Sequence, residues 1–219
     1  MYIDINITMS DEVTLFITSC GRPDLLRRTL ETFLQFNTYP IKEAVIIEDS
    51  GNKNSIDFVH DICHLFPCNV IYNEKRLGQM ASMEIGVKHI KTPYTFHCED
   101  DWEFYDYSFI EISMEILKSN PKISMVFLRS YDEYIFRYKM HIHPTKNNFN
   151  VLHQNNNSFY SFNPGLRRTS IYFEKYPYTA TNEDEGTLQE FYRSKGYISA
   201  VTKNNNGYVE HIGWGRHID

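Results

Sequence analysis

Three consecutive carboxylates in the segment YTFHCEDDWE, residues 94–103, carry the strongest chemical signal in this chain. Glu99, Asp100 and Asp101 repel one another, so solvent, a basic partner or a divalent cation must offset the repulsion. Carboxylate oxygens suit Mg²⁺ or Mn²⁺, and such sites commonly complete their coordination with substrate phosphates. The triplet alone leaves two interpretations open, a metal site and a solvated acidic turn.

Polar clusters follow three apolar, β-rich runs in the first half of the chain. The clusters are Ser19–Arg22, Glu48–Gly51 and Glu99–Asp101. In a parallel sheet the carboxyl ends of the strands meet at one edge, and ligands bind there. We therefore expect the three clusters to gather at a common site.

The elements that must position these clusters alternate between strand and helix. Short β-rich runs stand at residues 13–18, 44–47, 69–72, 94–98 and 123–128. Helical periodicity or helix-start signals separate them at residues 23–34, 54–65, 80–90 and 109–117. This alternation predicts an α/β fold, with a mostly parallel central sheet flanked by helices.

The second half of the chain is less regular. We expect a strand or hairpin over 134–143, an Asn-rich loop over 145–158 and a strand over 169–173. A helix over 183–195 ends at Gly196, and the short strands 198–201 and 208–210 follow. With no internal repeat and no long linker, residues 1–219 are predicted to form one domain.

Composition excludes several classes of protein. The 219 residues are 42% hydrophobic and 15% aromatic, which excludes disorder across the whole chain. A net charge of −6 argues against a partner held by phosphate neutralisation, so no nucleic acid is expected. No apolar run approaches the ~20 residues of a transmembrane segment, and the polar start is unlike a signal peptide. With only 4 cysteines, a reduced, cytoplasmic location is expected.

Several segments, taken in their order, resemble the GT-A glycosyltransferases, most closely family 2-like enzymes of the inverting type. They are VTLFITSCGRPDLLRRTLETFL, AVIIEDSGN and YNEKRLGQMASMEIGVKHIKTPYTFHCEDDWEF. The similarity spans roughly residues 12–105 and continues more weakly from about 160 to 217. It implies a Rossmann-like GT-A fold with a nucleotide-binding half over about 10–105 and a smaller, irregular acceptor-side half over about 106–219.

The resemblance also implies a function and a metal site. The enzyme would be metal-dependent, using Mn²⁺ or Mg²⁺ to transfer a sugar from a nucleotide-sugar donor, a UDP-sugar, to a hydroxyl of a glycan or glycoconjugate. Asp101 would bind the metal directly, Glu99 would face the ribose or the sugar, and Asp100 would lie between them. His211, after a short strand, matches a histidine that binds metal or diphosphate. Trp214, Arg216 and His217 would form a flap over the donor.

Other donor-site assignments follow from the same resemblance. The base and ribose would lie against Thr18, Ser19 and Cys20, and Arg22 could reach a phosphate. Either Glu48 or Asp49 would hydrogen-bond the uracil ring, and the sequence does not decide which. Arg76 belongs to a loop that would close over the base.

Inverting transfer needs a carboxylate that takes the proton from the acceptor hydroxyl. The acidic residues before the 183–195 helix resemble the family's acidic pair, and counting back from Gly196 favours Glu185 as the base, with Asp184 next. Towards the acceptor, Trp102 and Phe162 could stack on a sugar face and Asn163 could hydrogen-bond its hydroxyls.

Two other functions remain open at this point. A sugar nucleotidyltransferase would show a Gly-rich basic loop after the first strand, which SCGRPD matches poorly. A non-catalytic nucleotide-sugar or glycan-binding module is less consistent with the presence of Asp101, Glu185 and His211. The cluster HDICHLFPC at residues 60–68 does not have the spacing of a structural zinc site. The chain could also be one module of a longer multidomain polypeptide.

Overall fold

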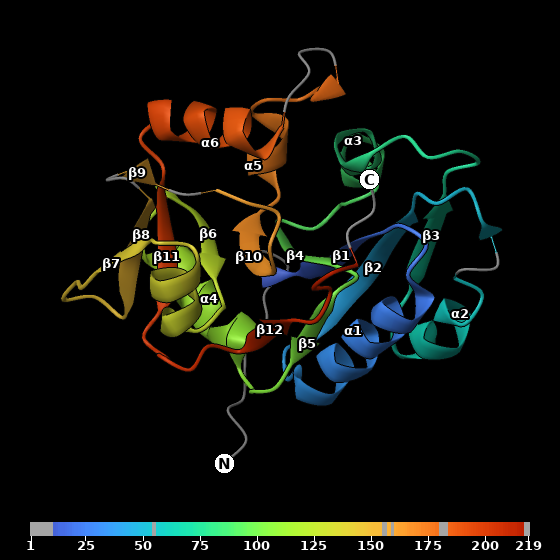
Figure 1. The fold of residues 1–219 in the computed structure, drawn as a ribbon, viewed down its shortest axis with the longest axis horizontal. Coiled ribbons are helices and arrows are strands. Elements are labelled where there is room, and N and C mark those ends of the chain that lie inside the picture. Colours follow the sequence, from blue (N-terminus) through green and yellow to red (C-terminus); the bar gives the residue numbers. More distant parts are fainter. Residues whose placement is uncertain (1–10, 54–55, 155–156, 159, 180–183, 217–219) are drawn as a thin grey trace.

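A computed structural model describes residues 11–53, 56–154, 157–158, 160–179 and 184–216. Within them a ten-stranded sheet runs in the order β3-β2-β1-β4-β10-β6-β11-β8-β7, with β9 paired to β8 (Figure 1). Its strands are β1 (Val13–Ser19), β2 (Ile41–Glu48), β3 (Cys68–Tyr72), β4 (Tyr94–Glu99), β6 (Ile123–Phe127), β7 (His141–His143), β8 (Phe149–Gln154), β9 (Asn157–Ser158), β10 (Gly165–Arg168) and β11 (Ile198–Thr202). A small separate sheet pairs β5 (Trp102–Phe104) with β12 (Val209–His211).

The first half of the chain has the predicted parallel arrangement. Strands β3, β2, β1 and β4 are all parallel, and Ser19 at the end of β1 lies opposite Glu48 at the end of β2. On the other side of β1, Thr18 pairs with Glu99. Strand β10 is antiparallel to both β4 and β6, and β11 is again parallel to β6. The predicted α/β class, with a helix-flanked, mostly parallel central sheet, is confirmed.

Helices cover both faces of the sheet (Figure 1). They are α1 (Pro23–Phe36), α2 (Val59–Ile62), α3 (Gln79–Val87), α4 (Phe109–Ser119), α5 (Ser170–Phe173) and α6 (Glu185–Ser194), with a 3₁₀ turn at Cys63–Leu65 and the π-helix η4 at Glu133–Arg137. Side chains alternate along β1: Leu15 and Ile17 join the core under α1 and α4, whereas Phe16 joins the core under α3 and α6. Gly86 lets α3 approach closely, because a Cβ there would lie 2.4 Å from the Phe16 ring.

Four sequence-based assignments differ from the structure. The strand expected over 169–173 is wrong, because strand β10 ends at Arg168 and helix α5 follows. The loop expected over 145–158 is also wrong: β8 pairs with β11 and buries Phe149 and Leu152. The polar Asn150 on β8 is accommodated by donating from Nδ2 to the Tyr131 hydroxyl at 2.8 Å.

The other two differences concern length and type. The segment 134–143, expected as a strand or hairpin, begins in a π-helix and extends only at β7. In the described part of 54–65, the expected helix is reduced to the short α2 and the 3₁₀ turn. Neither segment contributes to the strand ends around which the polar clusters gather.

Candidate active site

The ends of β1, β2 and β4 bring the three polar clusters together, as expected from strand order. They line a cavity of about 400 Å³ at this edge of the sheet. The lining residues are Thr18, Ser19, Cys20, Arg22, Asp49, Arg76, Gly78, Gln79, Ser82, Glu99, Asp100, Asp101 and His211. The cavity therefore contains most of the residues assigned to the donor and the metal.

Arg22 lies between two of the triplet carboxylates. Its guanidinium binds Asp100 through Nη2 and Nε, and its Nη1 lies 2.8 Å from Oδ2 of Asp101. Asp100 is 1% exposed and also accepts from Ser19 Oγ at 3.1 Å and from the Cys20 N–H at 3.3 Å. The repulsion within the triplet is thus offset by a cation from the protein itself, the Arg22 guanidinium.

Asp101 is joined to the C-terminal part of the chain. His211 Nε2 lies 3.1 Å from Asp101 Oδ2, and the Ile212 N–H donates to the Asp101 carbonyl at 2.9 Å. A Cβ on Gly213 would lie only 2.4 Å from the same Oδ2. Burial raises the pKa of Asp101, but the His211 hydrogen bond and the Arg22 charge outweigh it, so the pKa is lowered overall.

The residues after β12, Ile212–Arg216, form a strap along one side of the cavity. Arg216 makes two bonds to Asp24 at the start of α1, at 2.5 and 3.0 Å, and its carbonyl accepts from Arg22 at 3.3 Å. The Arg137 guanidinium lies over the Trp214 ring, with its Cζ atom 3.1 Å from the ring centroid. Of the expected flap, Trp214 and Arg216 therefore lie beside the site, and His217 falls outside the described residues.

The site offers two donor atoms suited to a cation. Asp101 Oδ1 and His211 Nδ1 are buried and have no hydrogen-bond partner among the described residues. The same part of the chain contains no group of three or more His, Cys, Asp or Glu side chains arranged to hold a metal by themselves. One carboxylate and one imidazole fit a cation that completes its coordination with substrate oxygens and water.

Glu48 braces the turn that follows β1. It is fully buried, and its Oε1 accepts from the Gly21 N–H at 2.9 Å and the Ser50 N–H at 2.8 Å. Its Oε2 accepts from the Ser19 hydroxyl at 2.8 Å. Gly21 has a φ of +67°, a conformation that favours glycine. Glu48 is absent from the cavity lining.

Asp49, by contrast, lines the cavity and accepts hydrogen bonds from the loop that precedes α3. Its Oδ1 accepts from Asn73 Nδ2 and the Leu77 N–H, both at 2.8 Å, and its Oδ2 accepts from the Gly78 N–H at 2.7 Å. Of the two residues expected to hydrogen-bond the uracil ring, only Asp49 borders the cavity. Arg76, in the loop that Asp49 holds, is exposed and lines the same cavity.

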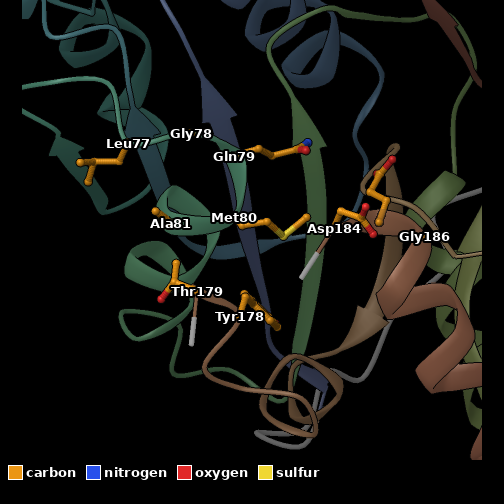
Figure 2. Close-up of a pocket in the computed structure, with 10 residues that line it drawn as sticks. Leu77, Gly78, Gln79, Met80, Ala81, Tyr178, Thr179, Asp184 and Gly186 are labelled. Carbon is orange, nitrogen blue, oxygen red and sulfur yellow. The ribbon is translucent and has the colours of Figure 1, made fainter. Parts of the chain in front are cut away.

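A second cavity, of about 690 Å³, lies between the starts of α3 and α6. Figure 2 shows Gln79 and Met80 projecting from α3 toward the side where Asp184 and Gly186 lie. Glu185 also borders this cavity. Gln79 belongs to both cavities, and its Nε2 donates to Glu99 at 3.0 Å. The two cavities therefore adjoin at the Gln79–Glu99 contact.

The two candidate bases have different environments. Asp184 is exposed and caps α6: its Oδ1 accepts from the Thr187 N–H at 2.7 Å, and Thr187 Oγ1 accepts from the Asp184 N–H at 2.8 Å. Glu185 is largely enclosed, and its Oε1 accepts from the Phe162 N–H at 2.6 Å. Burial raises the pKa of Glu185, which suits a group that takes up a proton.

Glu99 lies between the metal-binding candidate and the candidate base. Burial raises its pKa to about 8, and the charges of Asp101 and Glu185 act in the same direction. The Glu99 carboxyl group therefore keeps its proton to a higher pH than an exposed glutamate does.

Two of the three residues expected to meet the acceptor lie differently from that expectation. Trp102 and Phe162 are both 0% exposed, so neither ring offers a face for stacking on a sugar. Trp102 packs against His211, with ring centroids 5.0 Å apart. Asn163 is half-buried and its Oδ1 accepts from Arg129 at 3.2 Å. Phe162 packs against His97, with ring centroids 5.4 Å apart, so both rings fill the interior of the protein.

Sequence reasoning missed Arg129. It lies two residues after the end of β6 and is 4% exposed. It pairs with Glu133 at 2.5 Å and lies 4.3 Å from the centroid of the Trp102 ring. Its charge lowers the pKa values of both Glu99 and Glu185. A charged residue at the end of a predicted central strand was the signal that could have identified it.

Comparison with known proteins agrees with this geometry. The family model described as Glycosyl transferase family 2 matches residues 14–175. The chain belongs to glycosyl transferase family 2 and has the GT-A fold. No curated protein matches it. Among the described residues, no helix has the length and apolar character needed to cross a membrane.

Three solved structures show the same fold at low sequence identity. The mannosyltransferase PcManGT from Pyrobaculum calidifontis, in complex with GDP-Man and Mn²⁺, aligns with a TM-score of 0.66 at 10% identity, over 89% of this chain and 58% of its own. TarS from S. aureus with UDP aligns with a TM-score of 0.62 at 10% identity, over 90% and 59%. GalNAc-T7 with UDP, GalNAc and Mn²⁺ aligns with a TM-score of 0.66 at 14% identity, over 95% and 45%. The chain thus spans about half the length of these proteins.

Proposed function

We propose that this glycosyltransferase uses a divalent cation to transfer a sugar from a UDP-sugar to a hydroxyl of a glycan or glycoconjugate, with inversion. The observation that carries the proposal is the pair of adjoining cavities, one bordered by Asp101 and His211 and the other by Glu185. The nucleotide and Mn²⁺ complexes of PcManGT and GalNAc-T7 support the choice of donor class and metal.

Asp101 and His211 would hold the cation, Mn²⁺ or Mg²⁺, and each has a buried side-chain atom without a hydrogen-bond partner among the described residues. When bound, the cation supplies Lewis-acid stabilisation of the negative charge on the departing diphosphate. Arg22 supports the same site from the protein, because its guanidinium already lies against Asp101 and can pair with phosphate oxygens.

The nucleoside would lie against the end of β1 and the loop before α3. Thr18, Ser19 and Cys20 border one side of the cavity, and Asp49 and Arg76 border the other. We assign the contact with the uracil ring to Asp49 rather than Glu48, because Glu48 is enclosed by the turn that it braces.

The acceptor hydroxyl would approach through the second cavity and lose its proton to Glu185. A bond forms between the acceptor oxygen and the anomeric carbon as the bond from that carbon to the diphosphate oxygen breaks. The electron pair leaves with the nucleoside diphosphate, the proton stays on the Glu185 carboxyl, and attack opposite the leaving group inverts the anomeric centre. Asn163 follows Phe162, whose N–H binds Glu185, and would hydrogen-bond the hydroxyls of the acceptor.

Donor binding provides the test. Isothermal titration with UDP, GDP and a panel of UDP-sugars, with and without Mn²⁺, should show binding of a uridine nucleotide that requires the metal. Asp101→Asn should abolish the metal requirement together with most of the affinity. Glu103→Gln is the matched control, a partly exposed carboxylate two residues away, and should bind as the wild type does.

Turnover provides the second part of the test. Glu185→Gln should bind the UDP-sugar normally and lose about 10²-fold to 10⁴-fold in kcat. NMR of the product should show the anomeric configuration opposite to that of the donor. Binding of guanosine nucleotides alone, or full turnover in Asp101→Asn without added metal, would contradict the proposal.

A further inference from the structure

Arg167 on β10 is a charged side chain in the interior of the protein. It is 0% exposed and lies between the aromatic rings of Tyr160 and Tyr172, 5.5 and 5.6 Å from their centroids. Within the described part of the chain it forms no ion pair, although a buried cation ordinarily needs a compensating charge. Packing alone therefore does not explain why the Arg167 side chain is buried.

The two terminal nitrogens of the guanidinium donate instead to the segment between β9 and β10, whereas the buried Nε has no hydrogen-bond partner among the described residues. Nη1 donates to the Tyr160 hydroxyl at 3.2 Å and to the Ser161 carbonyl at 3.3 Å, and Nη2 donates to the Asn163 carbonyl at 3.2 Å. Arg167 thus holds the backbone on both sides of Phe162. One rigid, planar group with two donors fixes the orientation of that short segment.

The Ser161 carbonyl and the Phe162 N–H belong to the same peptide unit. The N–H of that unit donates to Glu185 Oε1 at 2.6 Å. A cation on the oxygen of a peptide polarises it, so that its N–H becomes a stronger donor. Arg167, the peptide and the Glu185 carboxylate therefore form one hydrogen-bonded chain from positive to negative charge.

We propose that Arg167 is a positioning residue for the reaction, which orients and polarises the peptide N–H that holds the Glu185 carboxylate. The inference rests on the proposed function, because it takes Glu185 as the base. Arg167 reaches the base only through the backbone and does not itself border either cavity.

The charges around Glu185 agree with this role. Arg167 and Arg129 both lower the pKa of Glu185, against burial and the charge of Asp184, which raise it. Glu99 is the remaining charged neighbour, and its coupling to Glu185 is repulsive. Loss of Arg167 removes one of the two cations that keep the base ionised.

The experiment measures kcat, donor KM and the pH profile of kcat for Arg167→Met and Arg167→Lys. Arg167→Met should lower kcat by about 10-fold to 100-fold and leave donor KM within about threefold. The acid limb of its pH profile of kcat should shift to higher pH by about one unit, because Glu185 loses a compensating positive charge. Arg167→Lys keeps the charge but has no planar fork, so kcat should fall while the acid limb stays in place.

Arg168→Met is the matched control. Arg168 is the next residue of β10, and its guanidinium donates to the Leu117, Asn120 and Ile123 carbonyls, away from both cavities. It should leave kcat and the pH profile unchanged even if it lowers Tm. If Arg167→Met does not fold, Arg167→Lys decides the matter by its separate effects on kcat and on the acid limb.

The inference is overturned if Arg167→Lys retains the wild-type kcat, or if Arg168→Met reproduces the losses seen at Arg167. Glu185→Gln separates this failure from failure of the proposed function. Full activity of Glu185→Gln removes Glu185 as the base, and the inference with it. If Glu185→Gln is inactive while the Arg167 variants behave like the wild type, only the proposed role of Arg167 is removed.

Discussion

Replacement of Glu99 by glutamine should stabilise the metal-free protein, and increasingly so as pH rises. The folded chain holds the Glu99 proton up to a pKa of about 8, against an ordinary value of 4.5, chiefly because of burial. The stability that this raised pKa contributes is fully present below pH 4.5 and is lost as pH rises toward 8. A glutamine cannot ionise, so Glu99→Gln escapes that loss.

The size of the effect follows from the two pKa values. Between them, each pH unit costs the wild type about 1.4 kcal/mol relative to the variant. At pH 7 the accumulated difference is on the order of 3 kcal/mol, and near pH 5 it is under about 1 kcal/mol. The hydrogen bond from Gln79 survives the change, because glutamine keeps an acceptor oxygen in place of Oε1.

Urea unfolding at pH 5, 6, 7 and 8, with EDTA present, measures the free energy of unfolding for both proteins. Glu190→Gln, at an exposed position on α6, serves as the control and should differ from the wild type by the same small amount at every pH. A difference between Glu99→Gln and the wild type that stays constant with pH, or a less stable variant at pH 8, would refute the reasoning.

Three further outcomes test the site. Gly213→Ala should lower stability by about 1–3 kcal/mol in thermal unfolding, because its Cβ would lie 2.4 Å from Asp101 Oδ2; an unchanged Tm would contradict this contact. Asp184→Ala should lower Tm by about 2–4 °C through loss of the α6 cap and keep kcat within about threefold; a large loss of kcat would move the base to Asp184. The kcat profile should fall as pH drops through a Glu185 pKa above 4.5, and an acid limb below that value would contradict its burial.

The donor side of the site could be inferred from the sequence because it depends on local pattern. Each cluster follows a short apolar run, and parallel strands must end at the same edge of the sheet. Pro23 and Asp24 marked the start of α1 in the same local way. Glu185 was chosen from the family resemblance and its distance from Gly196, within a helix expected from residue 183; the observed helix α6 begins at Glu185 itself.

The acceptor side could not be inferred in this way. Trp102 and Phe162 have residue types suited to sugar stacking, but both are fully buried. Whether an aromatic ring faces a cavity or the core depends on what packs above it, here His211 and the neighbouring strap in the case of Trp102. The Asn-rich segment likewise became strand β8 because β11 offers it an edge to pair with.

Local order in the chain was thus sufficient to predict strands β1 to β4 and β6, the start of α1 and the edge at which the clusters meet. Only the packed structure decided that Arg22 lies against Asp101, that His211 joins it from the far end of the chain, and that Arg167 reaches Glu185 through one peptide unit. The physical reason is that periodicity and capping depend on residues a few positions apart. Contacts between residues separated by tens of positions exist only after the sheet and its helices have packed.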